Sequence, residues 1–96
     1  MNRAERITDL LTGALAPLHL EVVDDSHQHE GHAGHGGAGH FRVRILSERF
    51  RGLPVLARHR LVYEALRSLI PAEVHALSIE ADAPGERASP PPFIDT

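Results

Sequence analysis

Histidine side chains that could bind a metal are concentrated in one glycine-rich segment of the chain. Residues 26–40 contain five of the eight histidines, namely His27, His29, His32, His35 and His40. Neutral imidazole is the commonest metal ligand in proteins, and it titrates near neutral pH. Because glycine supplies backbone freedom and no side chain to bury, residues 26–39 are expected to form a flexible loop. This loop either presents a metal or cluster ligand or is a solvated spacer whose histidines bind nothing.

The composition restricts the chemistry of such a site. The chain has 96 residues, a formal net charge of −3 and no cysteine, so it can supply neither a disulfide nor a thiolate ligand. A soft-metal cluster would have to take its thiolates from a partner. The net charge argues against strong non-specific nucleic-acid binding, although local basic patches can still act. No apolar run reaches the length of a membrane span, so no membrane association and a cytoplasmic location are expected.

The first half of the chain predicts one helix and two strands. Apolar residues at spacings of three and four, from Ile7 to Leu15, indicate an amphipathic helix over residues 2–16, with Asn2 as its N-cap. Residues 19–25 and 40–47 alternate between apolar and polar side chains, as half-buried strands do. These two strands are expected to pair as an antiparallel hairpin around the histidine loop.

The second half predicts another helix, a third strand and a tail. From Val55 to Ile70 the stripe Val55, His59, Val62, Leu66 and Leu69 indicates an amphipathic helix that Pro71 stops. A lone histidine such as His59 on this stripe is more often a packing residue than a ligand. Residues 74–81 form the third strand, and the proline-rich residues 83–96 a disordered tail. The sequence therefore predicts one α+β domain over residues 1–82, with helices on one face of a three-stranded sheet.

Several short motifs together resemble the BolA family. They occur in the family's order over roughly residues 3–80, and they are LEVVDDS at 20–26, His29, HFRV at 40–43, FRGL at 50–53, RHRLVY at 58–63 and VHAL at 74–77. The resemblance implies a class II KH-like αββααβ fold with a mixed sheet. It also implies a partnership with a monothiol glutaredoxin, with which BolA proteins share a 2Fe–2S cluster in iron–sulfur trafficking or iron and redox regulation.

The resemblance also implies the cluster ligands. The family's invariant ligand is the histidine of the VHAL motif, which is His75 here. The second ligand lies between the first two strands, and the family's spacing from Ser26 points to His29, with His40 as the substitute and a histidine-loop subtype. The glutaredoxin cysteine and glutathione would supply the thiolates, so the isolated protein is expected to hold no cluster. Without the resemblance, His75 could equally be a half-buried histidine at the end of the sheet.

Three alternatives to this function remain open. Some BolA proteins are DNA-binding transcriptional regulators, and Arg58, Arg60 and Arg67 supply local positive charge for such a contact, or else form a solvated helix face. A stand-alone zinc or nickel buffer is less favoured, because a glycine loop does not preorganise several ligands. Catalysis is not expected, since the chain lacks a nucleophile–base set and a phosphate-binding motif. The chain alone is expected to be a monomer or weak dimer.

Overall fold

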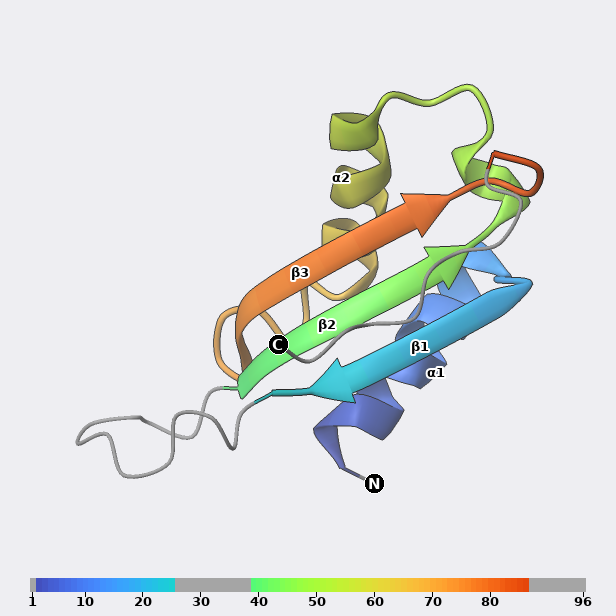
Figure 1. The fold of residues 1–96 in the computed structure, drawn as a ribbon. Helices are drawn as coiled ribbons and strands as arrows, with labels where there is room; N and C mark the ends of the chain where they lie inside the picture. The colour runs from blue at the N-terminus through green and yellow to red at the C-terminus, as the bar shows by residue number, and fades with distance from the viewer. Residues whose placement is uncertain (1, 26–38, 87–96) are drawn as a thin grey trace.

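The computed structural model describes residues 2–25 and 39–86 (Figure 1). Its elements are α1 (Arg3–Leu15), β1 (His19–Asp24), β2 (Gly39–Leu46), a 3₁₀ helix (Glu48–Phe50), α2 (Val55–Ala65) and β3 (Val74–Asp82). The predicted alternation of helices and strands is thereby confirmed. The predicted histidine loop falls in residues 26–38, outside the described residues, except for Gly39, which is the first residue of β2.

The αββααβ order is wrong, because a single α-helix lies between β2 and β3. The 3₁₀ turn at Glu48–Phe50 does not continue into a helix, since Gly52 adopts a φ of +78° and Pro54 has no N–H to donate. At the other end, α2 stops at Ala65 and not at Pro71. There the N–H of Leu66 is shared between the carbonyls of Val62 and Tyr63, both at 3.1 Å, which tightens the last turn.

The sheet has the strand order β1-β2-β3, with β1 antiparallel and β3 parallel to the central β2. Figure 1 shows α1 and α2 packed on the same face of this sheet. The mixed sheet with helices on one face is therefore confirmed. Because β2 and β3 are parallel, their first residues lie at the same end of the molecule.

The hydrophobic core lies between the two helices and the sheet. Its members include Ile7 and Leu11 of α1 and Phe41, Val43 and Ile45 of β2, all at most 2% exposed. The stripe predicted for the first helix is confirmed by its buried residues, and the alternation of β2 places its apolar residues toward the helices.

The buried face of α2 differs from the predicted stripe. Val62, Leu66 and Leu69 are buried as expected, but Val55 is 66% exposed and Arg58 is only 8% exposed. Arg58 can be buried because its guanidinium donates to the carbonyls of Leu53 (2.8 Å) and Ala81 (3.0 Å) and pairs with Glu86. A satisfied cation therefore occupies the position that apolar periodicity assigned to its neighbours.

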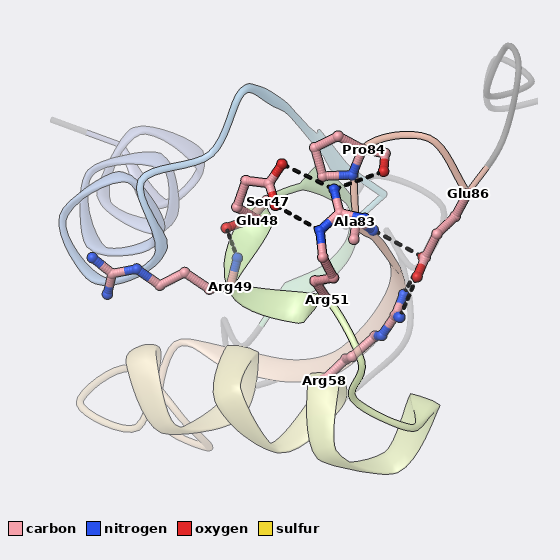
Figure 2. Close-up of polar contacts among 8 residues, drawn as sticks. All are labelled: Ser47, Glu48, Arg49, Arg51, Arg58, Ala83, Pro84 and Glu86. Carbon is pink, nitrogen blue, oxygen red and sulfur yellow. Dashed lines mark hydrogen bonds and ion pairs between the residues drawn. The ribbon is translucent and has the colours of Figure 1, made fainter.

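Residues 83–86, which the sequence assigned to the tail, pack onto the domain. Ala83 is fully buried, and its N–H donates to the Glu86 carboxylate at 2.9 Å. Both carboxylate oxygens of Glu86 accept from the Arg58 guanidinium at 2.6 Å (Figure 2). The described fold thus runs four residues past the predicted boundary at residue 82, and residues 87–96 lie outside the described residues.

Candidate functional site

Two predicted ligands, His40 and His75, lie side by side at one end of the sheet. His40 is the second residue of β2 and His75 the second residue of β3, and their ring centroids are 5.2 Å apart with an interplanar angle of 44°. The parallel pairing of the two strands brings these imidazoles together from distant parts of the sequence. Two imidazoles at this separation can approach a single metal atom from neighbouring positions.

An irregularity in the sheet aims His75 outward. Gly39 pairs with Val74 and His40 pairs with Ala76, so His75 has no residue opposite it on β2. This is the arrangement of a β-bulge, which redirects a side chain and is frequent next to functional sites. Strict alternation would have placed His75 on the core side with Leu77 and Ile79, but the histidine is exposed. The alternative of a half-buried histidine is therefore wrong.

Hydrogen bonds fix the backbone that carries the two histidines. The N–H of Asp25 donates to the carbonyl of His40 at 2.7 Å, and the N–H of Gly39 donates to the carbonyl of Glu73 at 3.0 Å. The Asp25 carboxylate also pairs with the Arg42 guanidinium, with an Nε–Oδ2 distance of 2.6 Å. The start of β2 is thus held to the end of β1 on one side and to the entry into β3 on the other.

The segment before β3 is also tied to α1. The Glu73 carboxylate pairs with the Arg6 guanidinium through both of its oxygens, and the Nη1–Oε2 distance is 2.9 Å. This bidentate pair is a geometrically specific contact. It holds the residues immediately before His75 against the first helix, so the imidazole projects from a supported turn.

The other predicted ligand, His29, lies outside the described residues, as do His27, His32 and His35. Within residues 2–25 and 39–86, no group of three or more histidine, cysteine or acidic side chains is arranged to hold a metal ion. His59 is half-buried on α2, away from the described pair. The described part of the candidate site therefore consists of two imidazoles, and its remaining ligands would come from elsewhere.

The face of the sheet opposite the helices carries an ion-pair ladder. Glu21, Arg44 and Glu80 occupy matching positions on the three strands, and Arg44 contacts Glu80 at 3.1 Å and Glu21 at 3.5 Å. A hydrogen bond from His19 at 2.6 Å, assisted by the charge of Arg44, lowers the pKa of the Glu21 carboxyl. These carboxylates are engaged within the sheet, far along the strands from the His40–His75 pair.

The three arginines proposed for nucleic-acid contact are in different environments. Arg58 is buried and committed to contacts within the chain. Arg67 is exposed and pairs with Glu64 at 2.9 Å, whereas Arg60 is exposed and makes no ion pair with any described residue. Only Arg60 and Arg67 are therefore accessible to a partner.

Comparison with known proteins identifies the family. Residues 11–86 match the family model for BolA-like proteins. The chain belongs to the BolA family. It is 44% identical over 92 residues to Protein BOLA1, chloroplastic, from Arabidopsis thaliana, covering 92% of this chain and 58% of the relative. It is 43% identical over 75 residues to the DNA-binding transcriptional regulator BolA of Escherichia coli, covering 78% and 70% of the two chains.

Solved BolA structures share this fold. The BolA domain of SufE1 from Arabidopsis thaliana has a TM-score of 0.79 and 42% identity, covering 91% of this chain and 98% of that one. BolA1 from the same plant has a TM-score of 0.77 and 40% identity, with the same coverage. Since the chain spans 58% and 24% of two full-length relatives, the activities of those whole proteins remain proposals for this chain.

Family membership confirms that the protein is not an enzyme, because BolA-like proteins are non-enzymatic. None of the helices in the described residues is long and apolar enough to cross a membrane. Relatives of this BolA-like chain carry names that include chloroplastic and mitochondrial forms. The cytoplasmic location expected from the sequence stays a prediction.

Proposed function

We propose that this BolA-like protein is the partner of a monothiol glutaredoxin and that the two share a 2Fe–2S cluster in iron–sulfur trafficking or iron and redox regulation. His75 is one ligand from this chain, and His40 or His29 is the second. The observation that carries the proposal is the His40–His75 pair, with ring centroids 5.2 Å apart at an accessible end of the sheet. The histidine-loop subtype is part of the same proposal.

The donor set fits such a cluster. The chain has no cysteine, so it can offer imidazoles alone, and the glutaredoxin cysteine and glutathione would supply the thiolates. Histidine ligation of one iron of a 2Fe–2S cluster raises the reduction potential above that of an all-thiolate cluster. The chain's own contribution is to hold His75 outward at the bulge and His40 beside it. Because only neutral imidazole binds iron, a lower pH should weaken the complex.

Reconstitution with iron, sulfide and glutathione tests the proposal. The pair should develop visible absorption and circular dichroism that neither protein gives alone. His75→Ala should change this spectrum and shorten the lifetime of the complex, whereas His19→Ala, a change at the opposite end of the sheet, should leave both unaltered. Comparing His29→Ala with His40→Ala identifies the second ligand. An unchanged spectrum with His75→Ala would exclude that histidine as a ligand.

Transcriptional regulation by DNA binding is the second candidate. It is supported by the accessible guanidinium groups of Arg60 and Arg67 and by the similarity to the Escherichia coli regulator. Sequence-specific binding of a promoter duplex at physiological salt, lost on Arg60→Glu, would favour this function. Binding that disappears between low and physiological salt for every sequence alike would count as a non-specific charge effect.

A further inference from the structure

The exposed face of α2 combines apolar and cationic side chains. Among the described residues the exposed large hydrophobic side chains are Val55 (66%), Leu56 (62%) and Tyr63 (43%), all on α2, and Leu18 (66%), before β1. Clustered exposed apolar groups mark interaction surfaces more often than single ones do. The concentration on one helix therefore needs an explanation beyond the fold.

These residues form a continuous stripe. Leu56, Arg60 and Tyr63 follow one another at spacings of four and three, which places them on one side of the helix, and Arg67 follows in the turn after α2. We call these four residues the α2 stripe. An open groove adjoins its second half and is lined by Arg60, Leu61, Tyr63, Glu64, Arg67 and Ile70. The stripe is apolar and cationic in alternation.

The groove lies near the histidine pair. Ile70, at its end, precedes His75 by five residues, and five residues span at most about 18 Å even when fully extended. Figure 1 shows the turn after α2 at the same end of the molecule as the start of β3. A standard protein interface covers about 800 Å² on each partner, a patch roughly 30 Å across. One partner can therefore contact both the histidines and the α2 stripe.

We propose that the α2 stripe is the docking surface by which the glutaredoxin is recognised before any cluster is present, through a segment that sets an acidic side chain between apolar ones. This inference rests on the proposed function. Arg60 has no ion pair among the described residues, so it is available to a carboxylate, and Leu56 and Tyr63 flank it with apolar surface.

A protein segment fits the stripe better than DNA does. Phosphate binding would use only the two arginines, one of which is already paired with Glu64. It would leave Val55, Leu56 and Tyr63 without a role, and Glu64 would repel the phosphates. A partner helix or strand with apolar anchors uses all of these groups.

Titration calorimetry of the cluster-free proteins tests the inference. Leu56→Ser and Arg60→Glu should each weaken binding of cluster-free glutaredoxin by about tenfold. Leu18→Ser is the matched control, because Leu18 is equally exposed but lies outside the stripe, and it should bind like the wild type. All three changes are at exposed positions, and unaltered thermal melting should confirm that the variants fold.

The outcomes separate the inference from the proposed function. If both stripe variants bind cluster-free glutaredoxin as tightly as the wild type, or if the wild type does not bind it, the docking inference is overturned. Cluster formation by reconstitution would in either case leave the proposed function standing. If instead the stripe variants lose affinity for a DNA duplex and keep it for glutaredoxin, the stripe is a nucleic-acid surface and the inference is again wrong.

Discussion

Replacing Arg58 should destabilise the domain more than replacing any exposed arginine. Its guanidinium donates to two backbone carbonyls, of Leu53 and Ala81, and to both oxygens of Glu86, while the residue is 8% exposed (Figure 2). Arg58→Met keeps the aliphatic stem and removes every one of these donors. The loss leaves two carbonyls and a carboxylate without their partner.

The size of the effect follows from these partners. Each partly buried acceptor left unsatisfied costs about 1–3 kcal/mol, and water can reach the Glu86 side, so we expect a loss of about 2–4 kcal/mol in the free energy of unfolding. For a domain of this size that corresponds to a drop of about 10–25 °C in Tm.

Denaturation followed by far-UV circular dichroism at pH 7 measures the loss. Arg60→Met is the matched control, because Arg60 lies on the same helix but is exposed, and its replacement should change the stability by less than about 0.5 kcal/mol. Equal stabilities for the two variants would refute the assignment of Arg58 to the fold, and its role as an available cation would have to be reconsidered.

Two further predictions concern the same end of the molecule. Ser47→Ala should cost about 1–3 kcal/mol, measured by urea unfolding, because the buried hydroxyl donates to the Leu15 carbonyl at 2.6 Å; a loss below about 0.5 kcal/mol would contradict this. The hydrogen bond from Arg58, and then that from the Ala83 N–H, lower the pKa of Glu86 from 4.5 to about 2. Since the folded-state pKa is depressed, this contribution is present above pH 4.5 and is lost as the pH falls toward 2. Glu86→Gln should therefore flatten the decline in stability over that range, and an unchanged pH profile would argue against the pairing.

The parts of the fold that depend on local periodicity could be predicted from the sequence. The stripe of Ile7, Leu11 and Leu15 and the alternation of Phe41, Val43 and Ile45 are visible within one helix and one strand. These patterns record which face is buried, and no distant contact is needed to interpret them.

The burial of Arg58 could not be predicted in this way. It depends on Glu86, a residue 28 positions away in a segment whose composition resembles a tail. Once the cation is satisfied, α2 turns Arg58 inward and leaves Val55 and Leu56 exposed. A pairing between distant residues thus reversed the assignment that hydrophobicity alone suggested for this helix.

The candidate site was predicted in its residues but not in its geometry. The resemblance pointed to His75 and His40, but their contact arises from the parallel pairing of β2 with β3. The bulge that exposes His75 leaves no signal in the alternation of Leu77 and Ile79. Strand pairing and register depend on the whole sheet, so a single sequence does not reveal them.

Nitrogen ligation of the cluster is the central claim, and pulsed electron paramagnetic resonance of the reduced complex tests it most directly. The glutaredoxin complex is prepared with this chain labelled with ¹⁵N-histidine and the partner unlabelled. We predict couplings from two ¹⁵N nuclei of this chain, one of which is absent in His75→Ala and both of which persist in the His19→Ala control. A reduced 2Fe–2S complex without ¹⁵N coupling, or with coupling unchanged in His75→Ala, would contradict the account.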